Sequence, residues 1–120
     1  MKLENIRVVD LSQFLPGPHL SMMMADHGAD VIMVESPSGE PVRNIGLRQN
    51  DEAIWFRNVS RGKKSISLNL KQDSGREALL RLLETADVVI EAFRPGVVDR
   101  LGIGYDSVKA INPGAVYCSI

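Results

Sequence analysis

The stretch Ala-Asp-Val-Val-Ile-Glu-Ala-Phe-Arg-Pro-Gly, residues 86–96, decides the fold of this chain. Its apolar run Val88–Ile90 is β-branched and too short for a helix, which is typical of a central parallel strand covered on both faces. Pro95 and Gly96 end the strand. Ligands of open parallel sheets bind beyond the carboxyl ends of the strands, so the candidate binding residues are Ala92, Phe93 and Arg94. The alternative is an ordinary turn in which the phenylalanine belongs to the core and the arginine is solvated.

Two more strands are expected upstream, over residues 6–11 and 29–35, where apolar runs are bounded by turn residues. Between them the pattern predicts a helix that begins at Pro18, since proline suits a first helical turn, and that ends at Gly28. A strand, a tight loop, a helix and a second strand form a βαβ unit with parallel strands and a right-handed crossover.

Residues 40–61 show neither helical nor strand periodicity. A segment of this length without regular structure inside a domain is usually functional or mobile. Trp55 and Phe56 are expected to anchor it to the core.

Downstream of this segment, the alternation of residues 65–70 predicts a third strand with one polar face, at an edge or a half-covered position of the sheet. The sequence Ser-Gly-Arg-Glu at 74–77 has the spacing of a capping box, and a leucine stripe then predicts a helix that ends before Ala86. The stripe consists of Leu79, Leu80, Leu82 and Leu83.

Beyond Gly96, the pattern predicts one helical turn over 97–101, a short helix over 105–111 and a final apolar strand over 115–120. Strands that alternate with helices predict an α/β fold, here a Rossmann-like open, mainly parallel sheet with flanking helices. No linker divides residues 1–120, so we expect one domain. A terminal strand of buried type leaves unpaired backbone groups, so we expect this domain to be incomplete, with more polypeptide following or pairing there.

The composition excludes several classes of function. A net charge of −1 without a basic block argues against nucleic acid as a partner. Charged residues interrupt every apolar run well short of a membrane span, and the N-terminus lacks the apolar core of a signal peptide, so we expect a cytoplasmic protein that does not enter a membrane. The single Cys118 and the two histidines, His19 and His27, predict neither a disulfide nor a metal site.

Glu35, at the end of the second expected strand, suggests a dinucleotide site in which an acid binds a ribose hydroxyl. The loop from Leu15 to Pro18 argues against this, because it lacks the G-x-G-x-x-G pattern and its prolines remove amide donors that would bind phosphate. We therefore expect Glu35 to cap or pair locally. No G-x-S-x-G motif is present and neither histidine has an evident acidic partner, so we expect no catalytic residue in this chain.

Six cations lie near the expected boundaries of loops and strands, where they would bind phosphate through charge and paired hydrogen bonds. They are Arg61, Lys63, Lys64, Lys71, Arg94 and Arg100. The alternative interpretation for each of them is an ordinary solvated surface charge.

Taken together, these stretches resemble the N-terminal part of family III CoA-transferases, a family that also contains α-methylacyl-CoA racemases. The resemblance spans essentially the whole chain, and it depends on the order and spacing of several motifs that are each weak alone. The motifs cover residues 9–12, 17–18, 25–35, 61–66, 86–96, 100–102, 111–113 and 117–120.

The resemblance implies that these strand ends bind coenzyme A as a substrate, without a metal. Transferred position by position, the family's contacts fall on Leu15, Pro16, Ser36, Leu68, Asn69, Leu70, Lys71, Ala92, Phe93, Arg94 and Arg100. It also implies an interlocked homodimer of the complete protein. The aspartate nucleophile of the transferases, like the His and Asp of the racemases, belongs beyond Ile120, so we expect the 120 residues alone to be inactive.

The implied function is the transfer of CoA between an acyl-CoA and a carboxylic acid through aspartyl anhydride and thioester intermediates, for which this chain supplies the CoA-binding loops. Racemase-type proton transfer at the α-carbon of an acyl-CoA is the first alternative, because the motifs at 15–18 and 91–96 fit both activities. A non-catalytic nucleotide-binding module is the second alternative.

Overall fold

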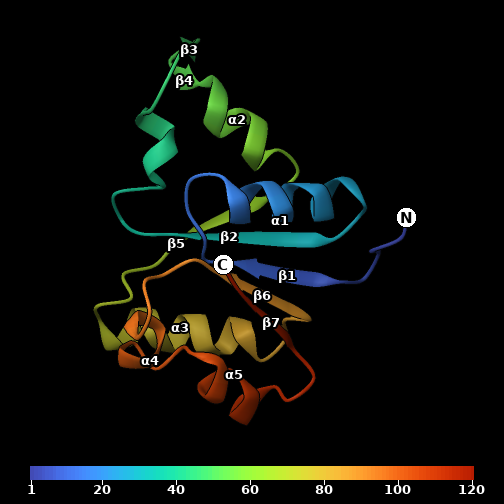
Figure 1. Ribbon diagram of the computed structural model, residues 1–120, viewed down its shortest axis with the longest axis vertical. Coiled ribbons are helices and arrows are strands. Elements are labelled where there is room, and N and C mark those ends of the chain that lie inside the picture. Colours follow the sequence, from blue (N-terminus) through green and yellow to red (C-terminus); the bar gives the residue numbers. More distant parts are fainter.

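A five-stranded parallel sheet forms the centre of the computed structural model, which describes residues 1–120 (Figure 1). From one edge to the other the strands run in the order β5, β2, β1, β6, β7, and every neighbouring pair is parallel. This confirms the predicted open parallel sheet and the edge position of the third predicted strand, β5. The strands are β1 (Arg7–Asp10), β2 (Asp30–Glu35), β5 (Lys64–Ser67), β6 (Val88–Glu91) and β7 (Val116–Ser119).

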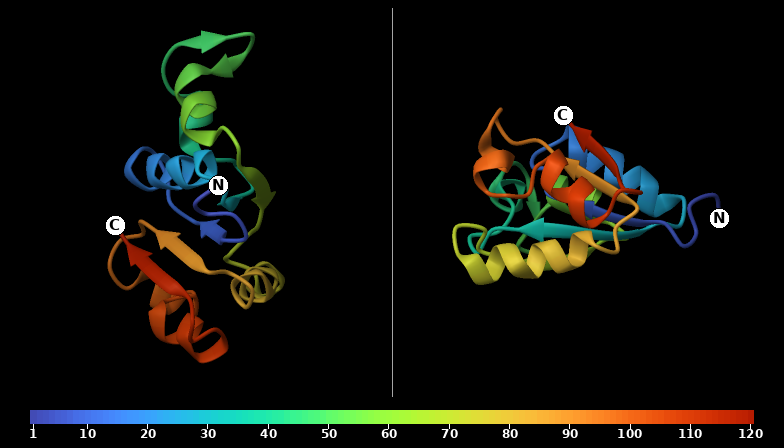
Figure 2. Two further views of the ribbon diagram at one scale, coloured as in Figure 1. Left: turned by 90° about the vertical axis from the view of Figure 1, so that its right-hand side faces the viewer. Right: turned by 90° about the horizontal axis from the view of Figure 1, so that it is seen from below.

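Helices lie on both faces of the sheet (Figure 1; Figure 2). One face carries α1 (Pro16–Asp26) and α2 (Ile54–Ser60), and the other carries α3 (Asp73–Leu83), α4 (Val97–Arg100) and α5 (Tyr105–Ile111). The chain builds outward from β1 to β2 and β5 and then returns to the other side of β1 for β6 and β7. This reversal places a topological switch point between β1 and β6, where open α/β sheets bind ligands. None of the helices combines the length and the apolarity that crossing a membrane would require.

Strand β6 is buried on both faces, as its apolar run predicts. Val89 and Ile90 are both fully buried, and their side chains point to opposite faces because they are successive residues of one strand. Val89 packs in a cluster with the fully buried Leu79 and Leu83 of α3, while Ile90 belongs to a cluster against which Leu20 of α1 packs. The leucine stripe of α3 therefore packs against one face of the sheet, as its helical spacing predicts.

The capping box predicted at the start of α3 is wrong. The helix begins at Asp73, so Ser74 lies inside its first turn, and the preceding Gln72 makes no side-chain capping hydrogen bond. The adjacent Gly75 is needed because a Cβ there would lie 2.1 Å from the carbonyl oxygen of Asn69. Close approach of a loop, rather than capping, explains the glycine in this turn.

Two predicted boundaries also shift. Helix α1 begins at Pro16 instead of Pro18, since the carbonyl of Leu15 already accepts a hydrogen bond from the His19 amide at 2.8 Å and proline at the first helical position loses no bond. Strand β5 ends at Ser67 instead of residue 70, because the chain turns at Asn69, whose carbonyl accepts the Gln72 amide at 3.1 Å.

The segment 40–61 is structured, which corrects the prediction that it lacks regular elements. It contains a 3₁₀ helix η1 (Pro41–Asn44), a hairpin of β3 (Arg48–Gln49) and β4 (Glu52–Ala53), and α2. These elements are too short to produce a periodic pattern in the sequence. The hairpin projects from the body of the molecule (Figure 2). Phe56 anchors the segment as predicted, being only 7% exposed, and the partly buried Trp55 packs against the same cluster.

Candidate functional site

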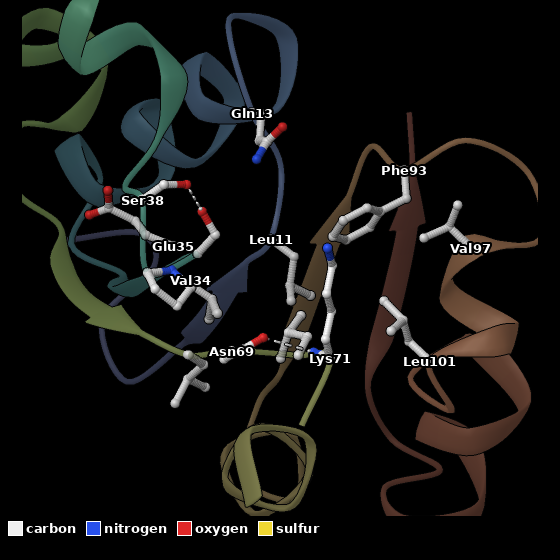
Figure 3. A pocket seen from close by; sticks show the side chains of 14 residues that line it. Leu11, Gln13, Val34, Glu35, Ser38, Asn69, Lys71, Phe93, Val97 and Leu101 are labelled. Atoms are coloured by element: carbon white, nitrogen blue, oxygen red, sulfur yellow. Dashed lines mark hydrogen bonds between the residues drawn. The ribbon is translucent and has the colours of Figure 1, made fainter. Parts of the chain in front are cut away.

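A cleft of about 550 Å³ opens at the carboxyl ends of the strands, beside the switch point between β1 and β6 (Figure 3). Its volume lies within the range of small-molecule sites, roughly 300–1,000 Å³. The ends of β1 and β2 with the turn after β2 contribute Leu11, Gln13, Val34, Glu35, Ser36, Pro37 and Ser38. The segment after β5 contributes Leu68, Asn69, Leu70 and Lys71, and the segment after β6 together with α4 contributes Phe93, Val97 and Leu101.

The cleft has an apolar interior and one free cation. Leu11 and Val34 are buried at its base, and Phe93 and Leu101 are half-buried at its side. Lys71 is exposed, and its side chain extends from the segment after β5 into the cleft (Figure 3). No carboxylate lies within ion-pair distance of Lys71, whose backbone amide is fixed by the Asn69 side chain at 3.1 Å. An apolar slot with a free ammonium at its mouth suits a ligand that joins a planar or aliphatic part to a phosphate.

Six of the eleven residues expected at a site line this cleft. They are Ser36, Leu68, Asn69, Leu70, Lys71 and Phe93. The other five lie outside its lining: Leu15, Pro16, Ala92, Arg94 and Arg100. Pro16 opens α1 and Leu15 precedes it, while Ala92 and Arg94 are exposed after β6. Arg100 is exposed at the end of α4.

Sequence reasoning missed several residues of the cleft. Leu11 and Val34 sit at strand ends, and Gln13, Pro37 and Ser38 lie in the loops that follow β1 and β2. Their position at or just beyond the end of a predicted strand was the available signal, since ligands gather beyond carboxyl ends. Val97 begins α4 and Leu101, its C-cap residue, follows one turn later, so both side chains face the cleft.

Three of the six candidate cations have a carboxylate partner in the structure, and only the pair of Lys63 is buried. Arg61 pairs with Asp26 at 2.6 Å, Lys64 pairs with Asp30 at 2.6 Å, and Lys63 pairs with Asp10 at 3.4 Å. The remaining three, Lys71, Arg94 and Arg100, have no carboxylate within ion-pair distance. The tertiary structure therefore leaves three of the six cations without a carboxylate partner.

The Asp10–Lys63 pair is buried below the loop after β1. Both side chains are 0% exposed, and the Lys63 ammonium also donates to the carbonyl of Pro18 at 2.8 Å. The Asp10 carboxylate further accepts the hydroxyls of Ser12 and Ser21 and the amide of Ser12. Burial lowers the pKa of Lys63, and the charges of Asp10 and Glu40 oppose that effect. These contacts fasten the start of α1 to β1 and to the chain just before β5.

Glu35 is satisfied locally, which confirms the expectation that it caps or pairs near itself. Its carboxylate accepts two hydrogen bonds from Arg43, at 2.6 and 2.7 Å, and one each from the Ser65 hydroxyl at 2.6 Å and the Glu40 amide at 2.7 Å. The hydrogen bonds from Arg43 are the main cause that lowers the pKa of Glu35 to about 2. Arg43 also stacks on the ring of Phe56 at 3.9 Å. With its lone pairs occupied, Glu35 shapes the cleft instead of binding a ribose.

The cleft holds no pairing of a nucleophile with a base, and the structure has no group of three or more His, Cys, Asp or Glu side chains arranged to hold a metal. The lining of the cleft is suited to binding a ligand, because it offers apolar walls, a rim of hydroxyl and amide groups, and a free ammonium group.

Comparison with known proteins relates the chain to one family of proteins. The family model for CoA-transferase family III matches residues 3–120. The succinyl-CoA:mesaconate CoA-transferase of Haloarcula marismortui is 43% identical over 98% of this chain and 31% of that protein. The formyl-CoA:oxalate CoA-transferase of Streptomyces coelicolor is 42% identical over 98% of this chain and 29% of that protein.

A solved structure agrees with both. The crystal structure of a CAIB/BAIF family protein from Brucella suis superposes with a TM-score of 0.92 at 42% identity, covering 97% of this chain and 32% of that one. The chain thus spans about a third of the length of the relatives that it matches.

Proposed function

The chain belongs to CoA-transferase family III, and from this membership we propose that it is the N-terminal CoA-binding part of an enzyme that transfers CoA between an acyl-CoA and a carboxylic acid. In this proposal residues 1–120 form a single unit whose cleft takes part of the CoA molecule. The aspartate that carries the acyl group and CoA in turn belongs to the length of the relatives that this chain does not cover.

The observation that carries the proposal is the convergence of loops from β1, β2, β5 and β6 on one cleft at the switch point. Apolar walls from Leu11, Val34 and Phe93 suit an adenine ring or an aliphatic arm, and Lys71 suits a phosphate. Arg94 and Arg100 stand outside the cleft with no carboxylate partner, where they would reach phosphates that extend beyond it. Leu15, Pro16 and Ala92 complete the proposed contact set on the same edge.

The proposal extends to the surroundings of the enzyme. We assign it to the cytoplasm and to a homodimer of interlocked subunits, with an acyl-CoA and a carboxylic acid as its substrates. CoA enters as a substrate, and no metal is assigned to the cleft.

Binding of CoA by the full-length protein tests the role of the cleft. Lys71→Ala is expected to raise the Kd for CoA about tenfold, because it removes one charge-assisted contact worth about 1.4 kcal/mol. Lys109→Ala, which removes the same charge from the exposed face of α5, is the matched control and is expected to leave the Kd unchanged. Equal Kd values for both variants and the wild type would show that CoA does not bind in this cleft.

The reaction itself is tested by incubating the full-length protein with succinyl-CoA and ¹⁴C-labelled carboxylic acids, mesaconate and oxalate among them, in deuterated buffer. Appearance of the label in a CoA ester supports the transferase. Deuterium uptake at the α-carbon of an acyl-CoA without any acid exchange would favour the racemase. CoA binding without either reaction would favour the non-catalytic module.

A further inference from the structure

Glu40 is a buried carboxylate that no basic side chain contacts directly, although the charges of Lys63 and Arg43 act on it from a longer distance. It is only 4% exposed, and no Lys, Arg or His nitrogen lies within ion-pair distance of it. One of its oxygens accepts the backbone amide of Val42 at 2.7 Å, which caps the 3₁₀ helix η1. The other accepts the backbone amide of Phe14 at 2.8 Å, from a loop that is 26 residues away in the chain. A local cap needs only the first of these bonds, so the second calls for its own explanation.

Phe14 occupies a costly conformation. Its φ is +66°, in the left-handed region that a bulky side chain enters at a cost of roughly 1–2 kcal/mol. Phe14 is 45% exposed, so burial of its side chain does not offset that cost. Strain of this kind persists only where the surrounding structure over-determines it, and it gathers at binding sites. The hydrogen bond that the Phe14 amide donates to Glu40 restrains this residue, which directly follows Gln13 in the lining of the cleft.

Glu40 is itself held rigidly. Its backbone amide donates to Glu35 at 2.7 Å, and Glu35 is bound by both Arg43 and the Ser65 hydroxyl of β5. The chain of contacts therefore runs from β5 through the end of β2 to the loop after β1. These are three of the four regions that line the cleft (Figure 3).

We propose that Glu40 is a positioning residue, which holds Phe14 in its left-handed conformation and thereby fixes the loop after β1 at the correct spacing from the turn after β2. Gln13 comes from the first of these loops and Ser36–Ser38 from the second, and all of them line the cleft, so the spacing of the two loops would set its width there. The inference rests on the proposed function, since it takes CoA as the ligand whose fit depends on that width.

A double-mutant cycle in the full-length protein, read as the Kd for CoA, tests this inference. Glu40→Ala is expected to raise the Kd about tenfold, and Glu40→Gln, which keeps one acceptor oxygen, is expected to raise it less. Phe14→Gly removes the cost of the left-handed backbone. In that background Glu40→Ala is expected to raise the Kd by less than threefold, because residue 14 no longer has to be held against strain. Glu77→Gln, an exposed carboxylate on α3, is the matched control and is expected to change nothing.

A role limited to capping η1 would give the same fold-change for Glu40→Ala with Phe14 and with Gly at position 14, and that result would overturn the inference. Unchanged CoA affinity in both Glu40 variants would also overturn it while leaving the proposed function intact. If Glu40→Ala does not fold, the Glu40→Gln cycle carries the same comparison. Failure of the wild-type protein to bind CoA would overturn the proposed function and, with it, the role assigned to Glu40.

Discussion

Replacing Glu35 by glutamine removes the charge at the centre of the best-connected polar group in the chain. The Glu35 side chain is only 4% exposed, and its carboxylate accepts four hydrogen bonds, two of them from Arg43. Glutamine keeps the shape but loses the charge and turns one acceptor into a donor that faces Arg43. We expect Glu35→Gln to lower the free energy of unfolding in a pH-dependent way.

The magnitude follows from the pKa of Glu35. Hydrogen bonds from Arg43, with smaller contributions from Ser65 and the Glu40 amide, lower that pKa from 4.5 to about 2. A difference of about 2.5 in pKa corresponds to about 3 kcal/mol, an upper value because the Arg43 side chain is 41% exposed and partly screened. Since the folded pKa lies below the unfolded one, this stabilisation is fully present above pH 4.5 and is lost as the pH falls toward 2.

Urea unfolding of the full-length protein, followed by far-ultraviolet circular dichroism, measures the effect. At pH 7 the free energy of unfolding of the wild type is expected to be higher than that of Glu35→Gln, by at most about 3 kcal/mol. This difference is expected to shrink between pH 4.5 and 2 as Glu35 of the wild type takes up its proton. Glu77→Gln serves as the isosteric control for an exposed carboxylate, with an expected change within about 0.5 kcal/mol.

A difference between wild type and Glu35→Gln that stays constant from pH 7 to pH 2 would refute the reasoning. It would mean that glutamine destabilises the protein through packing alone, and that the ionised carboxylate of Glu35 contributes nothing specific. Equal stability of the two proteins at pH 7 would refute it as well.

Three further variants of the full-length protein follow from the same structure, each measured by urea unfolding. Lys63→Met should lower the free energy of unfolding by about 3–5 kcal/mol because it leaves the buried Asp10 without a counter-charge. The double variant with Asp10→Asn should lose less than the sum of the two single losses. Gly75→Ala should destabilise by about 1–3 kcal/mol, since its Cβ meets the Asn69 carbonyl, and should also raise the Kd for CoA because Asn69 lines the cleft; an unchanged Kd would show that this loop does not contact CoA. Leu83→Ala should cost about 2–5 kcal/mol through a cavity between α3 and the sheet, and a loss below 1 kcal/mol would mean that this core collapses around the gap.

The elements that were predicted well are those whose evidence is local. The apolar run of β6, the leucine stripe of α3 and the bounds of α5 follow from hydrogen bonding and burial that repeat every two or every three to four residues. The segment 40–61 was missed for the converse reason. Its hairpin turns on Asn50 and Asp51 in left-handed conformations, and its strands are two residues long, so no period can develop.

The candidate site also has a part that the sequence predicts and a part that it does not. Its position at the carboxyl ends of the strands and the presence of Phe93 there were predicted from the end of β6, whereas residues 68–71 were expected there only from the family resemblance. Which side chains enter the cleft could not be predicted. Arg94 follows Phe93 directly and yet lies outside the lining, because the direction of a loop side chain depends on how the loop packs.

By itself the sequence determined the α/β class, the parallel strands, the helices around them and the family, since each depends on patterns carried by neighbouring residues or by motif order. Only the tertiary structure decided that Lys63 pairs with Asp10, 53 residues away, while Lys71 has no carboxylate partner, and that the Phe14 amide donates to Glu40. The physical reason is that the state of a charge depends on what folding brings within a few ångströms of it, and in this chain those partners come from strand ends that are far apart in sequence.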